Sequence, residues 1–373
     1  MKTRTAVLVI LGCLLAIGLP VLSEEEIFAS PLHEVLAFVP ALVISPMISF
    51  TDWTLIKAYT GMESVTSKSP EEERLALLQT TFKDQYDPSG YAPTLPSKHA
   101  EQWGFDKTDL VWEANVNTRE LPPIYLLKFR TGFDFDPLIA LFQTREFVQE
   151  QVHGATLFTH ELDLSAEWVR VAELSIHNTA LIPEERLAIL SSSPRAVEAM
   201  LQTRQGELAA LLGNSAAVAT VDRLGEIAGA MLLFGMDTCL GFTQSPLLDL
   251  IGEVPDEEIV ERLKAVLAQT PQLFPYEALG VGYRTEEDHP VGRIVFHYST
   301  AEVATVDLPL RQTLAEGGFS QSRKAPYSEI FFTLVDAVAY GEDLVLTVLP
   351  VNDQPKRLFQ MVLYRDMSFA GCQ

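Results

Sequence analysis

Apolar residues recur along this chain with two different periods, and the order of these periods predicts its secondary structure. In the middle of the chain, strand-like apolar segments alternate with segments that have the i, i+3, i+4 spacing of a helix. The predicted order is strand, helix, hairpin, strand and helix. The segments are 122–129 (strand), 136–147 (helix), 147–162 (hairpin turning at Gly154), 186–193 (strand) and 194–205 (helix).

The same order of periods recurs nearer the C-terminus, which predicts a duplicated module. The segments there are 292–299 (strand), 300–318 (helix), 319–326 with 327–341 (hairpin), 342–351 (strand) and 354–366 (helix). Aromatic positions recur with the pattern: Phe129, Phe147 and Phe158 correspond to Phe296, Phe319 and Phe332. The alternative is a chance coincidence of two common patterns.

One alternating segment precedes each copy, and it adds a strand to the sheet of that copy. These segments are residues 109–116 and 276–285. The predicted fold is therefore α+β, with two similar β-α-β-β-β-α modules, each an antiparallel sheet with helices on one face. The predicted regions are 24–108 (N-terminal helical segment), 109–205 (first module), 206–275 (helical connector) and 276–373 (second module).

Local capping signals mark helices outside the modules. Thr51 or Asp52 can cap a short helix that starts at Trp53 and ends at Gly61. The connector contains the clearest helical pattern, at 255–270, and a strand-like run at 230–234.

The first 23 residues have the pattern of a signal peptide. Lys2 and Arg4 precede an apolar run, and Ser23 offers a small residue for cleavage before an acidic segment. An uncleaved membrane anchor and lipidation of Cys13 are the alternatives. In each case we expect the bulk of the protein to be extracytoplasmic.

Two cysteines remain once Cys13 is set aside. Cys239 and Cys372 form an even pair in a chain with an export signal, which predicts a disulfide. Two buried free thiols are the alternative. No Cys-x-x-Cys motif occurs, which argues against thiol redox catalysis and cysteine-based zinc sites.

Charge and missing motifs exclude several classes of function. The chain of 373 residues carries 27 Lys and Arg against 50 Asp and Glu, a net charge of −23. Such a surface repels phosphate backbones and anionic lipid, so we expect no nucleic-acid partner. Membrane contact is expected only through an uncleaved N-terminus. The sequence lacks the motifs for a serine nucleophile elbow, a phosphate loop and a dinucleotide site, and it predicts no cofactor.

Histidines and carboxylates offer two candidate metal sites. His153 and His160 flank the predicted turn at Gly154, with Glu161 and Asp163 nearby, but they would meet only in one register. Calcium is the second candidate, at the acidic turns 84–90 and 134–136, neither of which matches the spacing of a calcium loop. Surface histidines, an ordinary turn and a helix cap at Asp136 explain these residues more simply.

A pair of carboxylates is the candidate for acid–base chemistry. Asp109 and Glu113 have the spacing that places both on one face of the predicted strand 109–116, with Trp112 on the other face. A hydrolase would need both carboxylates in a pocket open to solvent. The concentration of tryptophan in the first half (Trp53, Trp103, Trp112 and Trp168) fits a groove, but it fits a bulky core better.

The chain resembles a group of uncharacterised exported bacterial proteins. The resemblance rests on "FTDW" at 50–53, "SPEEER" at 69–74, "WGFDKTDLVWEA" at 103–114 and "LIPEERLAILSSSP" at 181–194. It covers most of the mature chain, and these motifs are structural landmarks. The resemblance implies export and a shared fold, and it assigns no activity and no site residues.

These observations favour a non-catalytic binding or assembly module at the cell envelope, with an unidentified protein or small ligand as its partner. A carboxylate-dependent hydrolase of an envelope or extracellular polymer is the first alternative. The external subunit of a membrane complex, held by an uncleaved N-terminal helix, is the second.

Overall fold

The computed structural model describes residues 30–43, 46–84, 100–101, 103–161, 174–242, 273–286, 289–320 and 322–372. Several predicted features lie outside these residues: the signal segment 1–23, the helix 255–270, Trp168, Asp163 and most of the turn 84–90.

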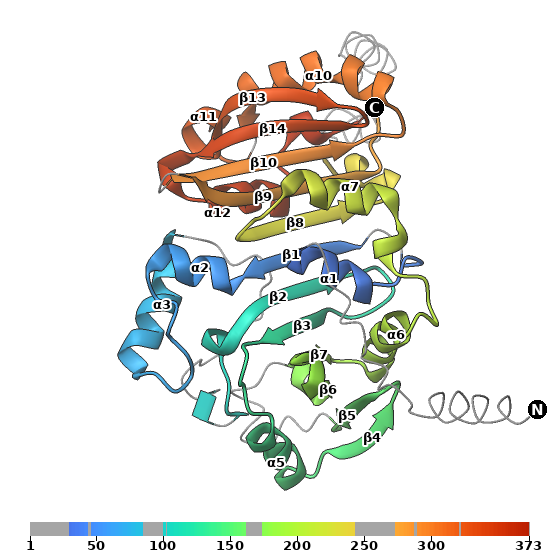
Figure 1. The fold of residues 1–373 in the computed structure, drawn as a ribbon. Helices are drawn as coiled ribbons and strands as arrows, with labels where there is room; N and C mark the ends of the chain where they lie inside the picture. Colours follow the sequence, from blue (N-terminus) through green and yellow to red (C-terminus); the bar gives the residue numbers. More distant parts are fainter. Residues whose placement is uncertain are drawn as a thin grey trace, which may run out of the picture.

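An antiparallel sheet of 12 strands forms the body of the molecule (Figure 1). Its strand order is β13-β14-β10-β9-β8-β1-β2-β3-β7-β6-β5-β4, and β11 pairs with β12 in a separate two-stranded sheet. The strands are β1 (Met47–Asp52), β2 (Leu110–Asn117), β3 (Ile124–Phe129), β4 (Val148–Val152), β5 (Ala155–Thr159), β6 (Asn178–Ile182), β7 (Leu187–Ser191), β8 (Gly229–Phe234), β9 (Ala278–Glu286), β10 (His289–His297), β11 (Phe319–Ser320), β12 (Ala325–Pro326), β13 (Phe332–Tyr340) and β14 (Asp343–Pro350).

Helices connect the strands and cover both faces of the sheet, which confirms the α+β class but corrects the prediction of helices on one face. The helices are α1 (Pro31–Phe38), α2 (Trp53–Thr60), α3 (Glu71–Asp84), α5 (Asp136–Thr144), α6 (Pro194–Arg204), α7 (Ser215–Leu224), α10 (Ala301–Glu316), α11 (Tyr327–Ile330) and α12 (Lys356–Leu363).

The predicted caps of α2 are confirmed. The Asp52 side chain accepts a hydrogen bond from the Leu55 amide at 3.0 Å, and Gly61 ends the helix in the left-handed region at φ 67°. At the predicted calcium turn 134–136, Asp134 accepts a hydrogen bond from the Asp136 amide, and α5 begins at Asp136 rather than being capped by it.

The two predicted sheets are one sheet, because β1 and β8 pair at its centre. Ser49 of β1 lies opposite Met231 of β8 in an antiparallel register. Both strands come from segments that we expected to be mainly helical. Nearly every residue in them is buried, as expected for central strands covered on both faces. A continuous apolar run does not reveal its sheet partner, so the sequence did not predict this junction.

The strand order of one half recurs in the other. Four strands run β2-β3-β7-β6 on one side of the centre, and four run β9-β10-β14-β13 on the other. The matching strand orders also correct one predicted correspondence, that of Phe158 with Phe332. β13, which carries Phe332, occupies the position of β6, a strand that the sequence did not predict, whereas Phe158 lies on β5. That the two halves arose by duplication stays a prediction.

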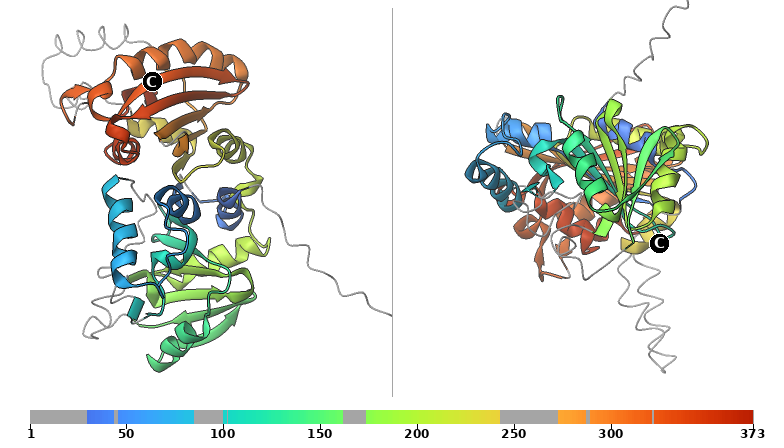
Figure 2. Two further views of the ribbon diagram at one scale, coloured as in Figure 1. Left: turned by 60° about the vertical axis from the view of Figure 1, so that its left-hand side comes forward. Right: turned by 90° about the horizontal axis from the view of Figure 1, so that it is seen from below.

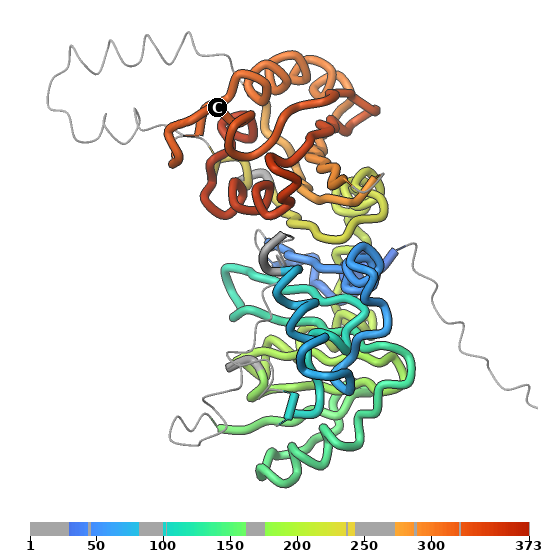
Figure 3. The backbone as a smooth tube through the Cα atoms, turned by 90° about the vertical axis from the view of Figure 1, so that its left-hand side faces the viewer, coloured from blue at the N-terminus to red at the C-terminus, as the bar shows by residue number. Residues whose placement is uncertain are grey.

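The sheet has two apolar cores, one on each face. We call the first the α7 face, because α1, α6 and α7 pack there against residues such as Phe50, Ile189 and Val295. We call the other the α12 face, where α2, α5, α10 and α12 pack against residues such as Phe129 and Phe296. Figures 2 and 3 show these helices on the two sides of the sheet.

The last helix of each half lies on a different face. α6 follows β7 and packs on the α7 face through Val197, Met200 and Leu201. α12 follows β14 in the same position of the order, yet it packs on the α12 face through Leu358 and Phe359. Among the described residues, no final helix of this kind therefore covers the α7 face of the outer strands in the second half.

Candidate functional site

The structure buries the two carboxylates that we considered for acid–base chemistry. Asp109 lies in a short 3-10 helix (Lys107–Asp109) that precedes β2, so it is not on the strand as predicted. Asp109 and Glu113 are both fully buried. Asp109 Oδ1 lies 3.2 Å from Arg130 Nε, and Glu113 Oε1 lies 3.0 Å from Lys107 Nζ. The open pocket that a hydrolase would require is therefore not formed around this pair.

This buried charge cluster fastens α2 to the sheet. Lys57 of α2 donates a hydrogen bond to the Thr108 carbonyl oxygen at 2.5 Å. Burial lowers the pKa of Lys57 to about 8, against the opposing effect of the Asp109 and Asp106 carboxylates. The Lys107 ammonium also lies 5.4 Å from the ring centroid of Trp53, the first residue of α2. Each charge in the cluster thus has a structural role.

The predicted hairpin exists, but its two histidines lie at opposite ends. β4 and β5 pair, and His153 and Gly154 form the turn with φ values of 48° and 74°. His160 follows the far end of β5, on the order of 20 Å away along an extended chain. His153 Nδ1 lies 3.0 Å from Glu207 Oε1, whereas the His160 ring lies 5.0 Å from the Phe147 ring. In the described part of the chain, no group of three or more His, Cys, Asp and Glu residues is arranged to hold a metal ion.

The predicted disulfide is formed. Cys239 and Cys372 are bonded, with their Cα atoms 5.3 Å apart, across a sequence separation of 133 residues. In the chain-entropy model, closing so long a loop stabilises the folded state by about 4–5 kcal/mol. Both cysteines are buried. The bond holds the C-terminal segment on the α12 face of the second half.

A buried arginine binds the same C-terminal segment. Arg311 of α10 is fully buried, and its Nε lies 2.6 Å from Asp307 Oδ2. Its Nη1 donates to the carbonyl oxygens of Phe369 at 2.5 Å and Gly371 at 3.3 Å, and its Nη2 donates to that of Phe274 at 2.6 Å. Arg311 and the disulfide together explain why the chain end stays on the α12 face.

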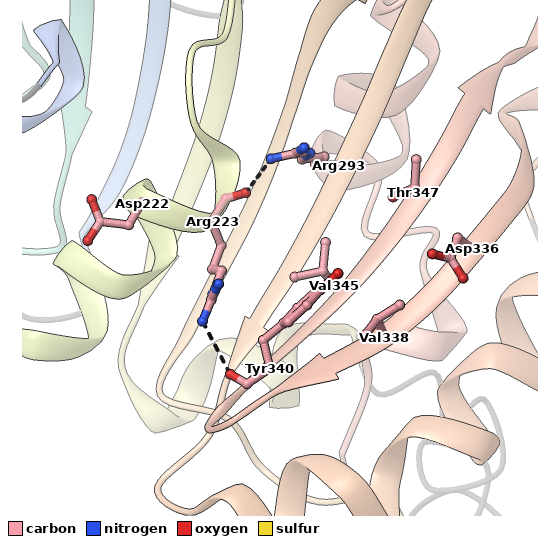
Figure 4. A pocket seen from close by; sticks show the side chains of 8 residues that line it. All are labelled: Asp222, Arg223, Arg293, Asp336, Val338, Tyr340, Val345 and Thr347. Atoms are coloured by element: carbon pink, nitrogen blue, oxygen red, sulfur yellow. Dashed lines mark hydrogen bonds between the residues drawn. The ribbon is translucent and has the colours of Figure 1, made fainter.

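A concave surface lies on the α7 face of the second half, at the strands β13 and β14, which no helix after β14 covers on that face in the described part of the chain. We call this surface the open face. It consists of Arg293 (β10), Val345 and Thr347 (β14), and Asp336, Val338 and Tyr340 (β13). With Asp222 and Arg223 of α7 at its rim, it encloses a shallow cavity of about 320 Å³ (Figure 4).

Exposure distinguishes the open face from the matching surface of the first half. Under α6, the residues Ala180, Ile182, Leu187 and Ile189 of β6 and β7 are fully buried. On the open face, Tyr340 is 48% exposed. Leu349, two residues beyond Thr347 and so on the same face of β14, is 44% exposed. Apolar sheet surface that is buried in one half is therefore accessible in the other.

Both arginines at the open face already have structural partners. Arg223 Nε lies 2.8 Å from Asp343 Oδ2, and its guanidinium lies 5.0 Å from the ring centroid of Tyr340. Arg293 Nη1 donates to the Arg223 carbonyl oxygen at 2.9 Å, at the end of α7, where a cation is favourable (Figure 4). Arg223 thus forms an ion pair, whereas Arg293 contacts backbone carbonyl oxygens.

A buried histidine supports the hairpin between β13 and β14. His297 Nδ1 lies 2.7 Å from Asp343 Oδ1, and both side chains are largely buried. The hydrogen bond to Asp343 raises the pKa of His297 against the effect of burial. Burial tends to raise the pKa of Asp343, but hydrogen bonds from His297 and Arg223 outweigh it and lower that pKa.

Asp336 is the carboxylate on the strands of the open face, and no counter-ion for it lies among the described residues. Its carboxylate accepts a hydrogen bond from the Ala337 amide at 2.9 Å, and no cation among the described residues lies within ion-pair distance. The open face therefore offers apolar side chains, one hydroxyl from Thr347, the Arg293 guanidinium and the Asp336 carboxylate. Sequence reasoning did not single out this region. The sequence signal for this region was the mainly apolar run on both sides of Asp336. Such a run does not show which face of the strand stays exposed.

None of the helices in the described part of the chain has the length and apolar character needed to cross a bilayer. No protein-family model and no curated protein matches the chain. Among solved structures, crystal forms I and III of TP0453 align with 88% and 86% of this chain and with 96% and 95% of that chain. The identities are 8% and 9%, and the TM-scores are 0.36 and 0.33.

Proposed function

We propose that this protein is an exported, non-catalytic binding or assembly module of the cell envelope, and that the open face is its binding surface. The observation that carries the proposal is the accessibility of Tyr340, Val338 and Leu349 on the outer strands of the second half. Their counterparts in the first half are buried under α6. An apolar surface that none of the described residues covers is typical of an interaction site.

Two further observations support an extracytoplasmic location. The Cys239–Cys372 bond belongs in an oxidising compartment, because cytoplasmic reductants keep thiols reduced. The N-terminal pattern, with Lys2 and Arg4 before an apolar run, supplies an export signal. The resemblance to exported bacterial proteins in "FTDW" and "LIPEERLAILSSSP" agrees with this placement.

Cysteine accessibility in intact cells tests both parts of the proposal. Thr347→Cys places a thiol on the open face, and Thr305→Cys places a matched thiol on the exposed side of α10, away from it. A maleimide that does not cross the cytoplasmic membrane is applied to cells and to the purified variants. We expect Thr305→Cys to react in both samples. We expect Thr347→Cys to react several-fold more slowly in cells than after purification.

Each part of the proposal has its own contrary result. If neither thiol reacts in intact cells while both react after purification, the protein is not extracytoplasmic. If Thr347→Cys reacts as fast in cells as after purification, nothing occupies the open face and the binding role is wrong. Electrophoresis without reductant shows whether the native disulfide is intact in each variant.

A further inference from the structure

The outer strand of the open face ends the sheet with an unpaired side. β13 is 9 residues long and pairs with β14, and no other described strand lies beside it. In an antiparallel pair, alternate residues direct their amide and carbonyl groups away from the partner strand. Ala337 fits such a position, since its amide donates a hydrogen bond to the Asp336 carboxylate at 2.9 Å. The outer side of β13 is therefore a template for one more strand.

The opposite edge of the sheet is built differently. β4 is only 5 residues long, and Gln149, Glu150 and Gln151 at its centre are exposed polar or charged side chains. Short, charged edges discourage the addition of further strands. Both edge strands expose one valine, Val148 at 57% and Val335 at 58%, but β13 is the longer strand and also exposes Tyr340 at 48%. The sheet is thus protected at one edge and receptive at the other.

The acidic residues on and beside β13 indicate which kind of segment can pair with this strand. Asp336 lies midway along β13 without a counter-ion among the described residues, and Glu329 and Glu342 lie just beyond the two ends of the strand. A second copy pairing antiparallel about the centre of β13 would place Asp336 opposite its own equivalent. Like charges directly opposite each other destabilise a strand pair. A segment with Lys or Arg at that position would instead neutralise the carboxylate.

We infer that β13 binds one extended segment of a partner protein, which adds to the sheet as a further strand. Strand addition takes its affinity from main-chain hydrogen bonds and its specificity from alternate side chains. The bound segment carries apolar residues at alternate positions, which extend the surface formed by Val338 and Tyr340, and a basic residue opposite Asp336. This inference rests on the proposed function, since it names the partner of the open face.

Synthetic nonapeptides test the inference on the purified full-length protein. The probe is fluorescein-labelled VTVTKTVTV, whose Lys shares one face of the strand with the Val residues, and its matched control is VTVTETVTV. A third peptide has the sequence of the probe with alternate amides methylated on the edge that would face β13. We expect the Lys peptide to bind about fivefold more tightly than the Glu peptide, the effect of one cross-strand charge pair. We expect the methylated peptide to lose binding by about tenfold or more.

Variants of the protein locate the site. Asp336→Lys should reverse the preference, so that the Glu peptide binds more tightly. Ala337→Pro removes the amide that donates to the Asp336 carboxylate, and we expect β13 to stay paired while peptide binding falls. Glu150→Lys makes the same charge change on the exposed edge strand β4 and should leave both affinities unchanged. Unfolding curves show that each variant is folded.

The possible results separate this inference from the proposed function. If the methylated peptide binds as tightly as the probe, the open face docks a partner through side chains alone, and strand addition is wrong. If the peptides fail to bind and the protein is a dimer that Ala337→Pro dissociates, a second copy occupies β13 and the inference is again wrong. Failure of all peptides with a monomeric protein also overturns it, and the binding role then stands or falls on the protection of Thr347→Cys.

Discussion

The two halves of the sheet share a strand order but differ in how the chain leaves the last strand. After β7, the chain enters α6 within two residues, and this helix covers the α7 face. After β14, it passes through a short 3-10 turn in which Asn352 and Asp353 have φ values of 57° and 53°. Asn and Asp tolerate this left-handed conformation better than most residues. The chain then enters α12 on the other face.

That difference in one turn has a large consequence for the surface. In the first half, α6 covers the α7 face of β6 and β7, and the edge strand β4 is polar at its centre. The second half keeps an accessible sheet face and a long free edge at β13. The position of a connecting helix, more than the sheet itself, thus decides where this fold can bind a partner.

The contacts of buried Arg311 with Asp307 and the C-terminal segment give the largest expected effect on stability, because they hold the end of the chain on the α12 face of the second half. Arg311→Met removes the partner of the buried Asp307 carboxylate and releases the carbonyl oxygens of Phe369 and Gly371. Leaving a buried charge unpaired destabilises a protein by about 3–5 kcal/mol. We expect that loss in the free energy of unfolding, measured by urea denaturation.

A double variant separates the charge effect from general damage. Asp307→Leu combined with Arg311→Met leaves no buried charge, so it should be more stable than Arg311→Met alone. The control, Arg119→Met in the exposed loop between β2 and β3, should change stability by less than about 0.5 kcal/mol. If the double variant is no more stable than Arg311→Met, Arg311 stabilises the protein through packing rather than by neutralising Asp307.

A glycine permits the close approach of α12, and its replacement has the next largest expected effect. A Cβ atom at Gly292 of β10 would lie 2.5 Å from Leu358 Cδ1 and 2.7 Å from Val348 Cγ2. Gly292→Val should therefore force α12 from the sheet and lower the free energy of unfolding by about 1–3 kcal/mol. Hydrogen exchange should rise in α12 and stay unchanged in α6.

The matched control is Gly213→Ala, since nothing lies within 4 Å of the Cβ position at Gly213 and its φ is not in the left-handed region. It should fold with unchanged or slightly higher stability. Equal loss of protection in α6 and α12 of Gly292→Val would contradict the view that the final helices of the two halves are held independently.

Sequence patterns predicted the local elements of both halves but not their assembly. The caps of α2 at Asp52 and Gly61 are encoded within a few residues, and they were confirmed. The Cys239–Cys372 pair was confirmed because only two cysteines remained to be paired. The pairing of β1 with β8 was missed, because it joins segments about 180 residues apart and neither strand shows a two-residue alternation that would identify its neighbour.

The candidate site shows the same limit. Even spacing placed Asp109 and Glu113 on one strand face, but the strand starts after Asp109, and Arg130 and Lys107 come in to bury both carboxylates. The open face depends on the position of α12, which lies on the α12 face and leaves the α7 face of β13 and β14 without a helix among the described residues. That position follows from the conformation at Asn352, which composition and periodicity do not specify.

The smallest expected effect on stability concerns the ion pair of His297 and Asp343 under the β13–β14 hairpin. The described residues of the first half form no equivalent pair. The pKa of His297 is raised in the folded state, so its contribution to stability is complete below about pH 6.5, the pKa in an unfolded chain, and declines as the pH rises through the folded value. The pKa of Asp343 is lowered, so its contribution is present above about pH 3.9 and declines as the pH falls through the folded value.

The pair should therefore stabilise the second half most between about pH 4 and pH 6.5. We expect His297→Gln to lower the free energy of unfolding by about 1.5 kcal/mol at pH 5.5, the contribution of one charge-assisted hydrogen bond, and by less at pH 8.5. His289→Gln, at an exposed histidine near the other end of β10, should show no such pH dependence. Because Asp343 also binds Arg223, a loss that is the same at both pH values would mean that His297 stays neutral and acts only as a hydrogen-bond donor.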